Sequence, residues 1–175
     1  VPGESYLAVL DALHDTEGAL DYVLCRNEGG AGFMAAAWGK LTGTPGICMV
    51  TRGPGATNAS IGVHTARQDS APMLLFVGQV ATDMMGREAF QEVDYPAVYG
   101  TMAKWAVEID RVERIPEIVS RAWTVATTGR PGPVVIALPE DMLSSETDAP
   151  AISGPVEILP PAPSGPAVTR AREIL

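Results

Sequence analysis

One carboxylate in this sequence lies where its neighbours could give it a chemical role. Glu28 follows an apolar run and immediately precedes Gly29 and Gly30, within the stretch CRNEGGAGFMAAAWGKLTG at residues 25–43. An acid in the first turn of a helix is favoured by the helix dipole and needs no function. Glycines beside it would, however, let a ligand or another backbone approach closely. Helix stabilisation and ligand binding are therefore both open for Glu28.

A glycine-rich loop, TRGPGATN at residues 51–58, is the second candidate. Such a loop at the start of a helix can offer free backbone N–H groups to a phosphate. It lacks the Lys and Ser/Thr of a P-loop and the G-x-G-x-x-G spacing of a dinucleotide site, and Pro54 removes one donor. Three interpretations remain for the loop: a phosphate site, a tight turn, or a flat surface that faces a ligand.

Short apolar runs alternate with longer amphipathic segments along the chain, and these elements must position both candidates. The runs predict strands, most of them apolar on both faces, as in a buried parallel sheet. They are residues 20–25, 46–51, 73–78, 104–109 and 133–138. The amphipathic segments predict helices over residues 4–14, 28–41, 55–67 and 115–127. This alternation predicts a doubly wound α/β fold, with a mainly parallel sheet and helices on both faces.

Ligands of open α/β sheets bind beyond the carboxyl ends of the strands. Four segments follow such ends and are expected to converge on one edge: residues 1–4, 26–30, 51–58 and 78–79. The helix at 4–14 has no strand before it, so a first strand is expected to precede Val1. The domain is expected to span residues 1–143. Residues 144–175 begin with a proline-rich stretch and are interpreted as a linker towards a central domain outside this sequence.

Composition excludes several classes of function. The formal net charge is −9, from 12 basic and 21 acidic residues, which argues against nucleic acid as a partner. No run of about 18 apolar residues predicts a membrane span. Cys25 and Cys48 lack metal-ligand spacing and are interpreted as buried free thiols in a reducing cytoplasm, and no metal site is predicted. His14 and His64 are lone histidines, interpreted as helix-surface or packing residues.

Five motifs, taken in order, resemble the N-terminal pyrimidine-binding domain of thiamine-diphosphate enzymes. The similar branch contains acetolactate synthases, benzoylformate decarboxylases and pyruvate oxidases, and the resemblance covers residues 1–143. The motifs are VPG at 1–3, RNEGGAGFMAAAWGKLTGTPGICMVTRGPGATN at 26–58, ARQDSAPMLLFVGQV at 66–80, AFQEVD at 89–94 and TGRPGPVVIALPEDM at 128–142.

The resemblance implies a catalytic role for Glu28. In such enzymes the equivalent glutamate hydrogen-bonds N1′ of the cofactor's aminopyrimidine and stabilises the imino tautomer, whose nitrogen deprotonates the thiazolium carbon C2. The implied cofactor is thiamine diphosphate, with Mg²⁺ held by a G-D-G…N motif of an absent C-terminal domain. FAD binding is left open.

The resemblance also implies further site residues. Pro2 and Gly3 should line the pyrimidine edge, and Pro54 and Asn58 should pack on the ring or hydrogen-bond near it. Gln91 should face the reacting end of the cofactor. Two residues are expected where acetolactate synthases line the substrate channel: Phe90 and Lys104.

The implied substrate is a 2-keto acid, and the implied enzyme is most like acetolactate synthase, which joins two carbon units after a decarboxylation. Acetolactate synthases usually carry Arg-His-Glu-Gln where this chain has Arg26-Asn27-Glu28-Gly29, so carboligation, decarboxylation and oxidation all remain open. A homodimer or homotetramer is expected, and residues 1–175 alone should be inactive. The alternatives are a non-catalytic binding domain that kept the fold and, disfavoured by the absent G-x-G-x-x-G, a nucleotide-binding domain.

Overall fold

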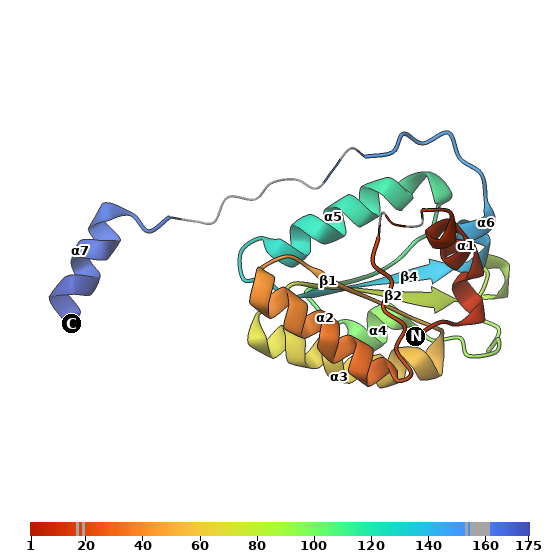
Figure 1. Cartoon of the computed structure of the whole chain (residues 1–175), viewed down its shortest axis with the longest axis horizontal. Coiled ribbons are helices and arrows are strands. Elements are labelled where there is room, and N and C mark those ends of the chain that lie inside the picture. The colour runs from red at the N-terminus through yellow and green to blue at the C-terminus, as the bar shows by residue number, and fades with distance from the viewer. Residues whose placement is uncertain (17, 19, 153, 155–161) are drawn as a thin grey trace.

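Four parallel strands form the centre of the molecule, in the order β1-β2-β4-β3 (Figure 1). The computed structural model describes residues 1–16, 18, 20–152, 154 and 162–175. The strands are β1 (Gly46–Val50), β2 (Met73–Gln79), β3 (Trp105–Glu108) and β4 (Pro133–Pro139). β4 is buried at every residue because strands lie on both sides of it and helices cover both faces of the sheet.

Helices cover both faces of this sheet. On one face lie α2 (Glu28–Thr42), α3 (Gly53–Asp69) and α4 (Tyr95–Tyr99), and on the other lies α5 (Ile115–Thr127) (Figure 1). The shorter helices and the C-terminal helix are η1 (Glu4–Tyr6), α1 (Leu7–Asp15), η2 (Thr82–Met84), η3 (Val112–Arg114), α6 (Glu140–Ser144) and α7 (Gly165–Ile174). The predicted doubly wound α/β fold is confirmed.

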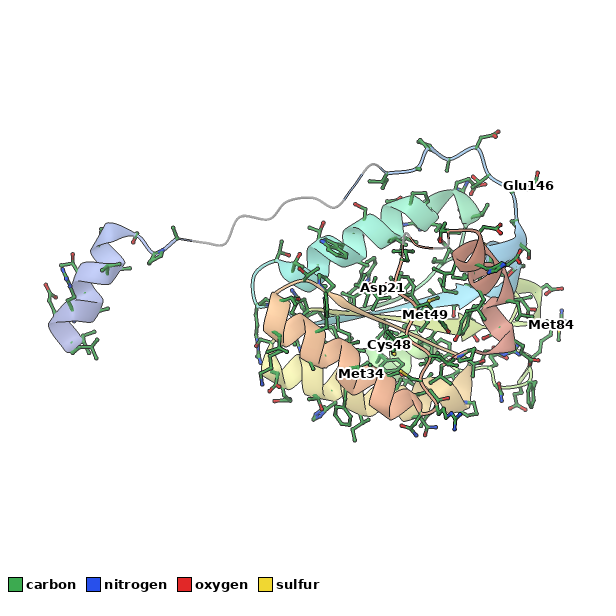
Figure 2. The ribbon with its side chains drawn as sticks, in the orientation of Figure 1. Asp21, Met34, Cys48, Met49, Met84 and Glu146 are labelled. Carbon is green, nitrogen blue, oxygen red and sulfur yellow. The ribbon has the colours of Figure 1, made fainter. Side chains whose placement is uncertain are left out.

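The sheet separates two apolar cores. Cys48 of β1 is buried in the core beneath α2 and α3, whereas its neighbour Met49 packs on the core beneath α5 (Figure 2). Successive residues of a strand point to opposite faces, so one strand serves both layers. Both cysteines are free thiols as interpreted, although Cys25 is only half-buried. Burial raises the pKa of the Cys48 thiol to about 11.

Two glycines let α2 and α3 approach each other closely. A Cβ atom on Gly62 of α3 would lie 2.6 Å from the Cα and carbonyl carbon of Gly32 on α2. Real Cβ contacts are not this short, so the two helices touch backbone to backbone at this point. The contact sets the distance between the amino-terminal ends of the two helices.

Most predicted element boundaries agree with the structure to within one or two residues. The strands predicted at 46–51, 73–78, 104–109 and 133–138 are present, and the helices predicted from 28 and 115 begin there. α3 begins at Gly53, two residues earlier than predicted, because Pro54 already adopts the first helical turn. The first helix is split into the 3₁₀ turn η1 and α1.

The strand predicted at residues 20–25 was wrong. The chain there has no strand pairing, and Leu20, Val23 and Leu24 are 63–65% exposed. A strand needs a hydrogen-bonding neighbour. Beside the open side of β1 lies Val1, whose ammonium group donates to the Met49 carbonyl at 3.0 Å. Among the residues that the structure describes, β1 pairs with β2 alone, so this apolar run has no partner strand.

The C-terminal helix of the chain buries none of its side chains. α6 ends at Ser144, residues 145–152 have no regular structure, and α7 follows as a helix with no buried side chain. The linker predicted at 144–175 falls partly outside the described residues, and the domain boundary stays a prediction. In the part of the chain that the structure describes, no helix is long and apolar enough to cross a membrane.

The contact between α2 and α3 predicts that one methyl group added at Gly62 destabilises the fold. Gly62→Ala should lower the free energy of unfolding by about 1–3 kcal/mol, because the added Cβ forces two backbones apart. Gly30→Ala is the matched control: its Cβ meets nothing nearer than 4.0 Å, and alanine favours a helix by up to about 1 kcal/mol. Denaturant unfolding of both variants measures the difference. A Gly62→Ala variant as stable as Gly30→Ala would contradict the packing.

Buried tyrosines predict unfolding in alkali. Tyr6, Tyr95 and Tyr99 are at most 1% exposed. Burial raises the pKa of Tyr95 to about 12 and also raises the pKa values of Tyr6 and Tyr99. Their stabilising contribution is complete below the unfolded pKa near 10, and is lost as pH rises through the folded values. We expect these three to ionise only as the chain unfolds, and exposed Tyr22 to ionise before them. Absorbance of tyrosinate recorded with circular dichroism tests this, and four ionisations near pH 10 in a folded chain would contradict it.

Candidate functional site

The carboxylate of Glu28 lies at the edge of the sheet where the parallel strands end. Glu28 is the first residue of α2, and the side chain of Asn27 caps this helix by accepting a hydrogen bond from the Gly30 N–H at 3.0 Å. Because α2 runs back to the start of β1, its first turn lies at the carboxyl end of the sheet. Asparagine is a preferred N-cap residue, so the capping role of Asn27 was readable from the sequence.

Asn58 of α3 fixes one oxygen of this carboxylate. Its amide Nδ2 donates to Oε2 of Glu28 at 3.1 Å. The two residues meet because Gly29 and Gly32 of α2 pack directly on α3: a Cβ on Gly29 would lie 3.4 Å from the Asn58 carbonyl oxygen. Glu28 is half-buried and Asn58 is exposed, so the pair faces a surface that a ligand can reach.

The other oxygen of Glu28 faces a glycine. A Cβ on Gly55 would lie 3.5 Å from Oε1 of Glu28 and 2.9 Å from Cγ2 of Thr51. Among the described residues, Oε1 accepts no hydrogen bond and Glu28 has no ion-pair partner. A partly buried carboxylate oxygen without a cation or a donor is a strong hydrogen-bond acceptor. Oε1 can therefore bind a donor group of a ligand.

The glycine-rich loop continues into the first turn of α3, and the N–H groups of Gly53, Gly55 and Ala56 are already bonded. Gly53 donates to the Gln91 carbonyl at 3.1 Å, and Gly55 and Ala56 both donate to the Arg52 carbonyl, at 2.9 and 3.2 Å. The proline between the two glycines has no N–H. Of the three interpretations open from the sequence, the phosphate site is therefore disfavoured, because three of the backbone donors that it would use are already bonded. The geometry is that of a tight turn with an accessible, apolar surface at Pro54.

The segment before η1 joins the same edge. Gly3 is extended and packs on Thr51, to which a Cβ on Gly3 would come within 2.5 Å. The hydroxyl groups of Ser5 and Thr51 are 3.0 Å apart. Thr51 thus contacts both Gly3 and the turn that faces Glu28. No pattern in the sequence singles it out as a site residue. Pro2 is exposed beside this contact.

Gln91 approaches the site from another side. It is a half-buried residue with a left-handed backbone (φ 64°), and its carbonyl accepts the N–H of Gly53 at the start of α3. Phe90 beside it is 73% exposed. A shallow open hollow of about 400 Å³ lies in the same loop; it is lined by Gly86, Glu88, Ala89, Glu92, Val93 and Asp94 and includes none of the predicted site residues.

Lys104 is the one predicted site residue that the structure does not bring to this edge. It precedes β3, at the amino end of the parallel sheet. Its Nζ donates to the carbonyl oxygens of Val125 and Thr128, and burial lowers its pKa. Its bonds join β3 to the end of α5.

These residues fit the pyrimidine half of a thiamine diphosphate site. A free carboxylate oxygen can bind a protonated ring nitrogen, and Pro54, next to Gly55, presents an exposed apolar surface to a flat ring. The described residues contain no group of three or more His, Cys, Asp or Glu side chains that could hold a metal ion. The groups that would hold a magnesium diphosphate are therefore not identified among them.

Comparison with protein families identifies a matching family. The family described as thiamine pyrophosphate enzyme, N-terminal TPP binding domain, matches residues 1–98. This range includes every residue of the edge described above that contacts Glu28, the glycine-rich turn or Gln91.

Similar proteins of established function are acetolactate synthases. The chain is 43% identical over 149 residues to the acetolactate synthase isozyme 3 large subunit of Escherichia coli (strain K12), covering 85% of this chain and 26% of that protein. It is 41% identical over 144 residues to the mitochondrial acetolactate synthase catalytic subunit of Saccharomyces cerevisiae, covering 82% and 21%. The large subunit from Lactococcus lactis is 43% identical over 145 residues, covering 83% and 25%.

The chain thus spans about a quarter of the length of these relatives. The match begins at residue 1 of the chain and contains the carboxylate, its asparagine partner and the glycine-rich turn. The chain therefore belongs to the thiamine pyrophosphate enzymes, as their N-terminal TPP-binding domain.

Proposed function

We propose that this chain is the pyrimidine-binding domain of an enzyme that acts on a 2-keto acid, most like acetolactate synthase, and that Glu28 is its catalytic residue. The observation that carries the proposal is the difference between the two oxygens of Glu28. Oε2 accepts a hydrogen bond from Asn58, whereas Oε1 faces Gly55 and accepts none among the described residues. Support comes from the names of the similar proteins, which are acetolactate synthases.

The proposed work of Glu28 is to hold a proton. Asn58 donates to Oε2 and turns Oε1 towards the turn at Gly55, so that one defined oxygen can share a proton with a ring nitrogen of the pyrimidine. When bound, thiamine diphosphate would supply a carbon nucleophile for the carbonyl carbon of a 2-keto acid. Pro2, Gly3 and Pro54 would bind and orient the ring, and Gln91 would face its reacting end.

Other residues would complete the site from outside this chain. Magnesium and the diphosphate need several oxygen ligands, and we propose that a further domain supplies them. An apolar stripe on α2, exposed to water here, is available to a covering partner. It consists of Phe33, Met34, Trp38 and Leu41, of which Leu41 is 85% exposed. Single exposed apolar residues are ordinary, but a stripe of this size beside a site marks an interaction surface, and we propose an oligomer with this face covered.

Replacing the catalytic carboxylate provides the main test. In the complete enzyme Glu28→Gln keeps the shape and one hydrogen bond but cannot exchange a proton. It should slow hydrogen–deuterium exchange at C2 of bound thiamine diphosphate by about 10²–10⁴-fold, the usual loss for one acid–base group. Glu117→Gln, an exposed carboxylate on α5 across the sheet, is the matched control and should leave the rate unchanged.

Normal C2 exchange in the Glu28→Gln enzyme would contradict the catalytic assignment. It would favour the alternative that the domain binds or assembles without catalysing a reaction. Thermal unfolding of both variants serves as a check that the substitution acts on chemistry, because Glu28 has no ion pair among the described residues whose loss would destabilise the fold.

Residues 1–175 on their own should bind the cofactor weakly. The described residues offer no metal-binding cluster, and the net charge of −9 repels a polyanion. A ring that is half-exposed gains only part of its burial energy, at about 25 cal/mol per Å², and must offset several kcal/mol of immobilisation. Titration calorimetry with Mg²⁺ present should show no binding tighter than millimolar. Micromolar affinity would show that this chain contains the diphosphate site.

A further inference from the structure

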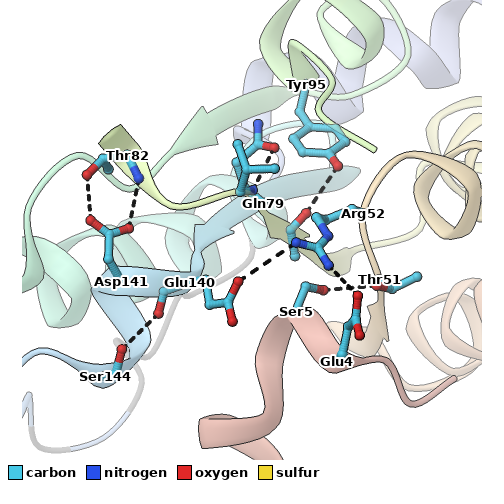
Figure 3. A network of polar contacts seen from close by, with 12 residues as sticks. Glu4, Ser5, Thr51, Arg52, Gln79, Thr82, Tyr95, Glu140, Asp141 and Ser144 are labelled. Carbon is cyan, nitrogen blue, oxygen red and sulfur yellow. Dashed lines mark hydrogen bonds and ion pairs between the residues drawn. The ribbon is translucent and has the colours of Figure 1, made fainter. Parts of the chain in front are cut away.

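A buried arginine lies at the carboxyl edge of the sheet between two exposed glutamates. Arg52, the N-cap residue of α3, is only 8% exposed. Its Nη2 donates to Oε1 of Glu4 at 2.7 Å, and its Nη1 lies 3.8 Å from Oε2 of Glu140. Figure 3 shows the guanidinium group between the two carboxylates, with the hydroxyl pair of Ser5 and Thr51 beside it.

Stability alone gives little reason for this arrangement. Burying a guanidinium group removes its hydration, and an apolar side chain of similar volume is often as good or better in such a position. Nε of Arg52 is buried without an acceptor among the described residues. A cation at the amino end of a helix also opposes the helix dipole, and α3 is 17 residues long. The glutamates, with side chains 70% and 57% exposed, would be solvated without it.

What Arg52 does achieve is to join three separate segments. Glu4 directly follows Gly3 at the start of the chain, Arg52 lies between Thr51 and the turn of α3, and Glu140 begins α6 after β4. The planar guanidinium group can bond two carboxylates in fixed directions, which a lysine ammonium group does less well. The bridge to Glu4 fixes the segment before η1 relative to the turn that carries Pro54 and Gly55.

We propose that Arg52 is a positioning residue for the pyrimidine pocket. It holds Pro2 and Gly3 against the first turn of α3. The proposal rests on the proposed function, in which these residues line the ring. Arg52 itself forms no hydrogen bond or ion pair with Glu28 in the described structure. Its loss should therefore weaken cofactor binding and leave the proton transfer at Glu28 intact once the site is filled.

The first experiment uses the chain without cofactor. Arg52→Met keeps the length and the apolar stem of the side chain and removes its charge and donors. Backbone hydrogen exchange at the amides that close η1, such as the Leu7 N–H that donates to the Glu4 carbonyl, should accelerate about tenfold or more, because the segment loses its tie to α3. Arg52→Lys should restore part of the protection through the pair with Glu4. The matched control is Arg130→Met: Arg130 bonds Ser70 and the Arg67 and Gln68 carbonyls, at the opposite end of α3.

The second experiment titrates the complete enzyme with thiamine diphosphate. In Arg52→Met the half-saturating cofactor concentration should rise about tenfold, the change expected for one charge-assisted hydrogen bond. The kcat and the C2 exchange rate at saturating cofactor should stay within about twofold of the wild type. Glu4→Gln, at an exposed position that should not impair folding, should raise the half-saturating concentration a few-fold in the same direction.

Each outcome decides the proposal. A half-saturating concentration unchanged in both Arg52→Met and Glu4→Gln overturns it, as does an equal rise in Arg130→Met, which would indicate general destabilisation. If Arg52→Met does not fold, Glu4→Gln and Arg52→Lys carry the test alone. The proposed function itself is tested separately. Normal C2 exchange in Glu28→Gln would contradict it, whatever result the Arg52 variants give.

Discussion

The backbone contact between α2 and α3 at Gly32 and Gly62 is the constraint on which the site depends. It brings the two helices close enough for Asn58, in the second turn of α3, to reach the carboxylate of Glu28 at the start of α2. Larger residues at either glycine would separate the helices and leave Glu28 as an ordinary first-turn acid. Oε1 faces Gly55 in the first turn of α3, next to the exposed side chain of Pro54.

The parallel sheet gathers the other residues at this edge. Because all four strands point the same way, the segments that follow them meet there. Thr51 follows β1 and contacts Gly3, Arg52 reaches towards Glu140 at the end of β4, and the loop after β2 brings the Gln91 carbonyl to Gly53. An acid, an amide and close-packed glycines come from three distant parts of the sequence. The electrostatic bridge at Arg52 then joins the beginning of the chain to this assembly.

Sequence patterns predicted the fold and the carboxylate but not the contacts between segments. Apolar runs and helix signals located four of the five expected strands and the start of α2, because these depend on local periodicity. The run at 20–25 is also mainly apolar but forms no strand, since pairing depends on a neighbour that periodicity does not report. The location of Lys104 follows from strand direction. It begins its predicted strand, so it lies at the opposite edge of the sheet from Glu28. The burial of Arg52 between two exposed acids has no local signal in the sequence.

The central claim is that one oxygen of Glu28 shares a proton with the cofactor's pyrimidine. Nitrogen NMR of the complete enzyme, loaded with thiamine diphosphate labelled with ¹⁵N at N1′, reports this proton directly. The account predicts an N1′ resonance shifted towards the protonated form in the wild type, and a return to the position of the free cofactor in Glu28→Gln. The same N1′ resonance in both enzymes would contradict the account.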